Sequence, residues 1–121
     1  MTWKSIRLAL ARTEDYPQGS SRHIYLIHLP LMPDGLVDGP EHGRHPELAT
    51  VHRYWGEEPA AAGYVIKADR GWALSYERGE DDDEMVFHLE SHPLRPGEYV
   101  TITNAQGLEL PMRVASVEDV K

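Results

Sequence analysis

The stretch Leu94–Val117 reads LRPGEYVTITNAQGLELPMRVASV, and it decides the fold class. Two runs rich in β-branched and aromatic residues flank Asn104–Gly107, four turn-forming residues that end in a glycine. A four-residue hairpin loop can require a positive φ, which glycine adopts freely, so the stretch predicts a β-hairpin. Side chains alternate between the two faces of a strand, and one face of this hairpin is apolar. The predicted core residues are Val100, Ile102, Leu108, Leu110, Met112 and Val114.

The rest of the chain repeats this pattern of short alternating runs separated by turn residues. No long helix separates the runs. The pattern therefore argues against strand–helix–strand units, in which a helix connects two parallel strands. The sequence predicts an all-β fold, a small barrel or barrel-like sandwich of about eight short, mostly antiparallel strands in a single domain, residues 1–121. Whether the first and last strands pair is left open. The other expected strands are Trp3–Ala11, Arg22–Leu29, Leu48–Trp55, Gly63–Ala68, Trp72–Glu77 and Met85–Glu90.

The long connection Pro30–Glu47 is rich in proline and glycine and is expected to hold at most one short helical turn. Asp38 can cap such a turn at its N-terminus, and Pro40 fits just inside the start because its fixed φ is helical. A connection of this length inside a small domain indicates a functional or mobile segment.

Composition and charge exclude two classes of partner. The chain of 121 residues has 20 acidic and 12 basic residues, a net charge of −8, and no cluster of Lys and Arg. This charge repels phosphate groups, so nucleic acid and anionic membranes are not expected partners. No apolar run approaches the roughly 20 residues of a membrane-spanning helix, and Met1–Arg7 does not resemble a secretory signal. We expect a cytoplasmic protein.

The absence of cysteine excludes disulfides, zinc ribbons, iron–sulfur clusters and cysteine nucleophiles. Seven histidines are the most unusual chemical feature. His42 and His45 lie beside Glu41 and Glu47, and imidazole and carboxylate groups bind zinc and other first-row metals. Gly43 disfavours the helix that would place both rings on one face. We name His42 and His45 as candidate metal ligands, and a cross-strand group of His28, His52 and His88 stays open.

No catalytic constellation is predicted. The serines lie in no nucleophile elbow, and no glycine loop suits a phosphate. The run Glu80–Glu84 is expected to be a solvated loop, because calcium loops need spaced acids rather than consecutive ones. The sequence therefore predicts no cofactor. A set of aromatic residues is expected to pack in the core or to line a pocket in a barrel mouth: Tyr25, Tyr54, Trp55, Tyr64, Trp72, Tyr76 and Tyr99.

Two segments, Trp3–Ser20 and Phe87–Val100, resemble a group of short, functionally uncharacterised bacterial all-β proteins. The resemblance implies a bacterial source and assigns no role to any residue. The segment Pro96–Ile102, with Arg113 after it, is similar to segments of the flavin barrel of ferredoxin reductases. Ala115 stands where that family has a tyrosine, so no flavin is expected.

The strand Arg22–Leu29 is apolar on both faces. If one face lies outside, Tyr25, Ile27 and Leu29 form a hydrophobic interaction surface, which a symmetric homodimer would cover. Two functions follow from the sequence. The first is a non-catalytic β-barrel that binds a protein or a ligand or associates with itself. The second is a histidine-based metal-binding protein or metal-dependent enzyme.

Overall fold

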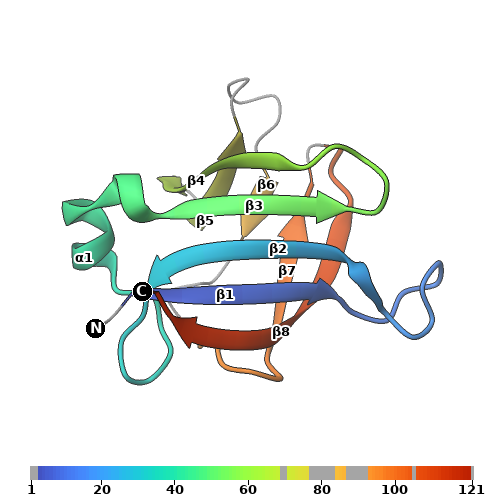
Figure 1. Ribbon diagram of the computed structural model, residues 1–121, viewed down its shortest axis with the longest axis horizontal. Coiled ribbons are helices and arrows are strands. Elements are labelled where there is room, and N and C mark those ends of the chain that lie inside the picture. The colour runs from blue at the N-terminus through green and yellow to red at the C-terminus, as the bar shows by residue number, and fades with distance from the viewer. Residues whose placement is uncertain (1–2, 69–70, 77–83, 87–92, 105, 121) are drawn as a thin grey trace.

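The chain forms an all-β structure in which neighbouring strands pair in sequence order (Figure 1). The computed structural model describes residues 3–68, 71–76, 84–86, 93–104 and 106–120. Within these ranges the strands are β1 (Trp3–Leu10), β2 (Ser20–Pro30), β3 (Thr50–Trp55), β4 (Ala61–Ala68), β5 (Gly71–Tyr76), β6 (Glu84–Val86), β7 (Tyr99–Thr103) and β8 (Glu109–Asp119).

The strands form a closed antiparallel barrel. Each strand pairs with the next one, and β8 pairs with β1 from Lys4 opposite Asp119 to Leu10 opposite Met112. The register of β1 shifts between Arg7 and Leu8 against β8, and irregularities of this kind bend a strand and help a sheet to close. The barrel predicted from the sequence is confirmed, and the pairing of β8 with β1 settles the closure that the sequence left open.

The C-terminal hairpin has the predicted faces. Val100, Ile102 and Met112 point into the barrel and are buried, and Gly107 has a φ of 83° in the turn. Leu108 was expected in the core, but its side chain is 60% exposed because it belongs to the turn rather than to β8.

Several strand boundaries differ from the sequence expectation for local reasons. Strand β3 begins at Thr50 rather than Leu48, because Pro46–Leu48 forms a 3-10 turn, η1. Strand β4 begins at Ala61, since two residues of the alanine triplet extend it. The expected strand Met85–Glu90 is described only at its start, and its residues 87–90 lie outside the described ranges.

A short helical segment covers one end of the barrel, on the left of Figure 1. The segment α1 (Gly39–Arg44) begins as predicted, with Asp38 as N-cap accepting a hydrogen bond from the Glu41 amide at 3.1 Å. The Trp3 indole donates to Glu41 Oε2 at 2.9 Å, which ties α1 to β1. His42 is buried beneath the helix, where its Nε2 donates to the Val65 carbonyl at 2.8 Å.

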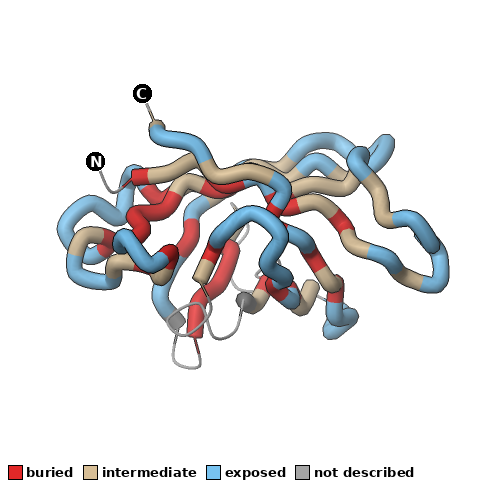
Figure 2. Tube along the Cα trace, turned by 90° about the horizontal axis from the view of Figure 1, so that it is seen from below, coloured by how far each residue is buried: buried red, intermediate tan, exposed pale blue. Residues whose placement is uncertain are grey.

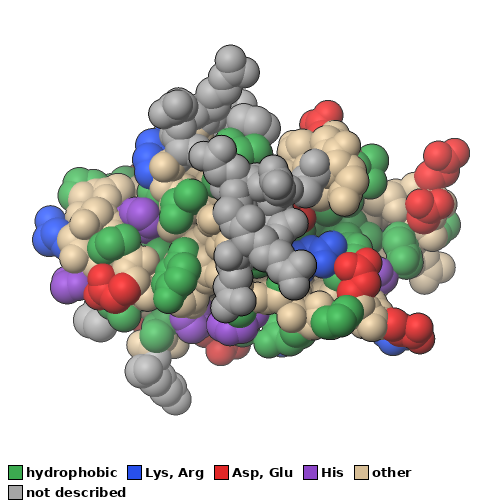
Figure 3. All heavy atoms as spheres, turned by 90° about the horizontal axis from the view of Figure 1, so that it is seen from above, with side chains coloured by type: hydrophobic (Ala, Val, Ile, Leu, Met, Phe, Trp, Pro, Cys, Tyr) green, Lys and Arg blue, Asp and Glu red, His purple; other side chains and the backbone are tan. Residues whose placement is uncertain are grey.

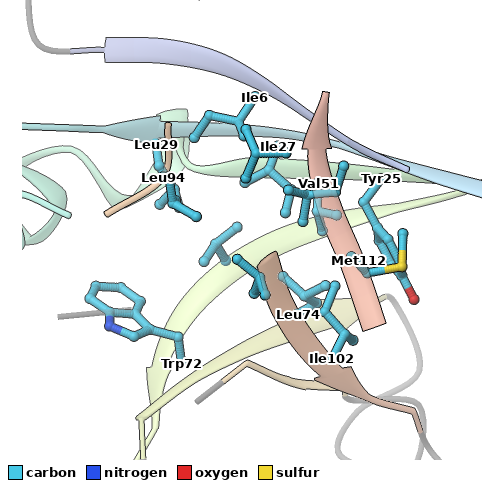
Figure 4. Close-up of a cluster of buried hydrophobic side chains, with 14 of the residues drawn as sticks. Ile6, Tyr25, Ile27, Leu29, Val51, Trp72, Leu74, Leu94, Ile102 and Met112 are labelled. Atoms are coloured by element: carbon cyan, nitrogen blue, oxygen red, sulfur yellow. The ribbon is translucent and has the colours of Figure 1, made fainter. Parts of the chain in front are cut away.

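Apolar side chains fill the barrel interior (Figure 4). Trp72 lies at one side of this cluster and Tyr25 at the other, with the Tyr25 hydroxyl pointing away from it. The void between the central side chains is about 10 Å³, too small to hold a ligand. Figure 2 shows the same division along the chain, with buried stretches in the strands and exposed residues in the connections.

The expected interaction surface on β2 is wrong in its placement. Tyr25, Ile27 and Leu29 point into the barrel and are buried. Both faces of β2 are apolar, so alternation alone could not decide which face is inside. The neighbouring strands decide it, because Tyr25 and Ile27 pair with the inward residues Leu8 and Ile6 of β1. The outward residues of β2 include Ile24, Leu26 and His28, which are half-buried.

Candidate functional site

The candidate site lies at the end of the barrel opposite α1, where β3, β5 and β7 end and β6 begins. Here the inward-facing side chains change from apolar to polar. The apolar cluster ends at Tyr25, and the next side chains along the strands are Arg53, Tyr76 and Glu84. We call this end the mouth.

Glu84 is the centre of a buried polar network at the mouth. The residue is only 4% exposed, and its carboxylate accepts hydrogen bonds from two tyrosines. The Tyr25 hydroxyl donates to Oε2 at 2.9 Å and the Tyr76 hydroxyl donates to Oε1 at 2.7 Å. Arg53 Nε lies 3.8 Å from Oε2 and supplies a compensating positive charge. A buried carboxylate is tolerated because it has this set of donors and a counter-charge.

The sequence expectation for Glu84 is therefore wrong. We expected the run Glu80–Glu84 to be a solvated loop, but Glu84 is the first residue of β6 and lies inside the barrel. The other four acids of the run lie outside the described residues.

Burial raises the pKa of both tyrosines, and the negative charge of Glu84 raises each pKa further. Arg53 opposes these increases without reversing them. Tyr25 and Tyr76 therefore keep their protons at neutral pH. Each remains a hydrogen-bond donor to Glu84, which fixes the floor of the mouth.

Arg53 connects the buried network to the surface. Its side chain is 18% exposed, its Nη1 lies 3.3 Å from Glu58 Oε1, and its guanidinium stacks over the Trp55 ring at 4.6 Å. Arg53 Nε is buried and has no hydrogen-bond partner among the described residues. The atom faces the Glu84 carboxylate, 3.8 Å from Oε2, so it belongs to the ion pair beneath the pocket and is closed to a ligand.

A pocket of about 370 Å³ opens above this network. Asn104 Oδ1 accepts the backbone N–H groups of Gln106 and Leu108, so the β7–β8 turn is held at the pocket rim. The lining offers both donors and acceptors beside an indole, a combination that suits a polar ligand. The lining residues are Arg53, Trp55, Glu58, Ala61, Tyr76, Glu84, Asn104 and Gln106.

A second hollow adjoins the first and shares Trp55 and Glu58 with it. His23 stands in its wall with both ring nitrogens engaged, Nδ1 at 2.7 Å from Ser20 Oγ and Nε2 at 3.2 Å from the Tyr16 hydroxyl. Its ring meets Trp55 edge to face at 4.8 Å. His23 therefore acts as a support for Trp55 rather than as an exposed base.

Acidic side chains predominate around the mouth, on the right of Figure 3. Glu57 and Glu58 are exposed there, and the β1–β2 connection adds Glu14 and Asp15. The opposing positive charges are Arg12 in the β1–β2 connection, Arg22 at the second hollow, and Arg53, which is occupied by Glu58 and Glu84. A highly charged anion would therefore meet repulsion at this end of the barrel.

The structure does not bring the candidate metal ligands together. His42 is buried with its Nε2 on the Val65 carbonyl and its ring against Trp72, whereas His45 is exposed near Glu47. Among the described residues no group of three or more histidine, aspartate or glutamate side chains is placed to hold a metal ion. His28 lies 3.3 Å from Thr50 Oγ1, and the third member of the open cross-strand group, His88, lies outside the described ranges.

The aromatic residues expected to line a pocket are dispersed. Trp55 and Tyr76 line the mouth and Tyr25 lies beneath it. Trp72 packs at the α1 end, while Tyr54, Tyr64 and Tyr99 are exposed.

Sequence reasoning missed the pairing of Arg53 with Glu84. A usable signal was present, because Arg53 shares the face of β3 with Val51 and Trp55, and a charged residue on an inward face indicates a buried partner.

The fold and the site define a closed antiparallel β-barrel with a filled interior and a polar mouth. Comparisons with protein-family models, with curated proteins and with solved structures found no match. No helix among the described residues has the length and apolar character needed to cross a membrane.

Proposed function

We propose that the protein is a non-catalytic binding module that takes a small polar ligand at the mouth of its barrel. The observation that carries this proposal is the pocket of about 370 Å³, whose lining combines the Arg53 guanidinium and the Trp55 ring with two side-chain amides, those of Asn104 and Gln106. The interior of the barrel is packed with apolar side chains, so the ligand sits on the mouth and not inside the barrel.

The lining indicates the ligand's chemistry. Arg53 and the side-chain amides of Asn104 and Gln106 supply donors, while Glu58 supplies an exposed acceptor. A neutral molecule with both hydroxyl or amide donors and oxygen acceptors satisfies this set. A dianion meets the charges of Glu58 and Glu84 and is disfavoured.

The non-catalytic part of the proposal rests on the state of the titratable groups. Glu84 is held by two tyrosine donors and Arg53, and both tyrosines retain their protons at neutral pH. This arrangement supports a rigid floor for a ligand rather than a group that exchanges protons with a substrate. A bacterial source and a cytoplasmic location stay predictions of the sequence.

Nuclear magnetic resonance with three probes tests the proposal. Maltose and N-acetylglycine amide are neutral and each carry donors and acceptors, whereas succinate carries two negative charges. We expect maltose or N-acetylglycine amide at millimolar concentration to shift the side-chain signals of Trp55, Asn104 and Gln106, and succinate to shift them less. The proposal fails if none of the probes moves these signals.

Two variants locate the interaction. Gln106→Ala removes an exposed amide from the rim, and Arg53→Lys keeps the positive charge but removes the planar guanidinium that stacks over Trp55. Both should weaken the response to the binding probe severalfold. The matched control is Gln18→Ala, an exposed residue outside the lining of the mouth pocket, which should leave the response unchanged. Equal responses in all of these proteins would place binding elsewhere.

A further inference from the structure

Exposed apolar side chains gather on the outer face of β3 and β4. Tyr64 is 50% exposed, Tyr54 is 42% exposed and Ile66 is 38% exposed. We define the β3–β4 outer face as these three residues together with the outward residues between them, which are Thr50, His52 and Ala62.

The face is hollowed by an open groove of about 610 Å³. Its lining includes Pro46, Thr50, His52, Ala62, Tyr64 and Ile66. A groove flanked by exposed aromatic and aliphatic side chains is a feature of surfaces that contact another protein. Tyrosine suits such a surface, because it buries a large apolar ring and keeps a hydroxyl for the rim.

The distribution of charge indicates which kind of protein would bind the β3–β4 outer face. The β3–β4 outer face contains no aspartate or glutamate, although the whole chain has 20 acidic and 12 basic residues. Glu47 is the one carboxylate among the described residues that line the groove, and its Oε2 lies 3.5 Å from His45 Nδ1. Two copies, each with a net charge of −8, repel each other over acidic surface, and contact is less unfavourable where carboxylates are few.

A symmetric contact imposes the same condition. A two-fold axis sets one face against an identical face, so a face rich in charges of one sign would repel its copy. The neutral β3–β4 outer face meets this requirement, whereas a basic foreign partner would be drawn to the acidic mouth near Glu57 and Glu58. We propose that a second copy of this chain docks on the β3–β4 outer face to form a symmetric homodimer.

The closed barrel fixes the mode of association. Each described strand pairs on both sides, with β1 completing the ring against β8, so a second copy cannot add a strand at an open edge. Contact must therefore occur through side chains. The other strongly exposed apolar residues, Tyr99 and Leu108, lie on the β7–β8 hairpin, where Tyr99 is opposite Arg113 and Leu108 precedes Glu109.

Light scattering coupled to size-exclusion chromatography tests the dimer. We expect the wild-type protein at high micromolar concentration to have twice the 13.7 kDa mass of one chain. Tyr64→Glu should give a monomer, because it places a carboxylate in the face, and its melting temperature should show that it is folded. Tyr99→Glu, a matched change at a residue that is 63% exposed on β7, should remain a dimer. A monomeric wild type, or equal masses for the two variants, overturns the proposal.

A cross-linking experiment does not depend on disrupting the face. The chain has no cysteine, so Ala62→Cys introduces a single thiol at the centre of the β3–β4 outer face. Under mild oxidation this variant should form a covalent dimer at least tenfold faster than Thr101→Cys, whose thiol is exposed on β7. Equal rates contradict the proposal. Either result leaves the ligand proposal standing, because the mouth pocket contains neither residue.

Discussion

The Tyr76 hydroxyl donates to Oε1 of Glu84 at 2.7 Å, while Oε2 of the same carboxylate accepts from Tyr25. One carboxylate thus joins β2, β5 and β6 at the mouth. Three strands that are not all neighbours in the sheet are held by a single side chain. The polar floor of the mouth is therefore a structural element as well as the base of the candidate site.

The tyrosine network should contribute measurably to stability. Tyr25→Phe and Tyr76→Phe each remove one donor and leave a buried carboxylate oxygen without that partner, which should lower the free energy of unfolding by roughly 1 to 3 kcal/mol. Tyr99→Phe is the control, because its side chain is exposed and makes no hydrogen bond in the described structure. Urea denaturation compares the three variants. Loss of stability in Tyr99→Phe alone would contradict the assignment of the network.

The C-terminal hairpin provides a paired test of the inward face. Met112 is fully buried, so Met112→Asp should lower the free energy of unfolding by several kcal/mol, on the order of 3 or more. Leu108→Asp, on the same hairpin but in the exposed turn, should change it by less than about 0.5 kcal/mol. Thermal melts followed by circular dichroism measure both. Similar melting temperatures for the two variants would contradict the placement of Met112 in the core and of Leu108 in the exposed turn.

Gly63 should not tolerate a side chain. A Cβ atom at this position would lie 2.0 Å from the Ser75 carbonyl oxygen, and backbone atoms of β5 cannot move aside as a flexible side chain can. Gly63→Ala should therefore be strongly destabilising or fail to fold. Gly43→Ala is the control, since a Cβ atom there would meet nothing outside α1 within 4 Å, and this change should be neutral or slightly stabilising. Soluble yield and melting temperature report the difference.

His28 should titrate below the ordinary histidine pKa of 6.5, because burial lowers its pKa and nearby His52 lowers it further. The neutral form is then favoured in the folded protein, so the contribution of His28 to stability is present above pH 6.5 and decreases as the pH falls through its folded-state pKa. His52→Ala should raise the pKa of His28 but leave it below the ordinary value, since burial remains. Proton NMR titration of the His28 imidazole signals measures its pKa in the wild type and in His52→Ala. A wild-type value above 6.5 would contradict this prediction.

Local signals in the sequence were sufficient for the hairpin and the helix cap. The alternation of side chains in Tyr99–Val114 predicts the hairpin, and Asp38 with Pro40 predicts the start of the helix. Each signal lies within a few residues, and the structure confirms both predictions. The state of Glu84 could not be predicted in this way. Five adjacent acids look solvated, and the burial of the last one depends on Tyr25, which is 59 residues away in the sequence. The inward face of β2 was likewise undecided, since only the pairing with β1 distinguishes Tyr25 from Ile24.

The ends of the described chain meet beside α1. The amide of Val120 donates to the carbonyl of Trp3 at 3.2 Å, and the Lys4 ammonium pairs with the Asp119 carboxylate. Both lie at the opposite end of the barrel from Arg53 and Glu84. A tether or a fused protein at either terminus would therefore leave the mouth facing away from its support. The same closeness suits the barrel to circular permutation, with a short peptide joining the two ends and new termini opened in the Gly56–Ala60 connection.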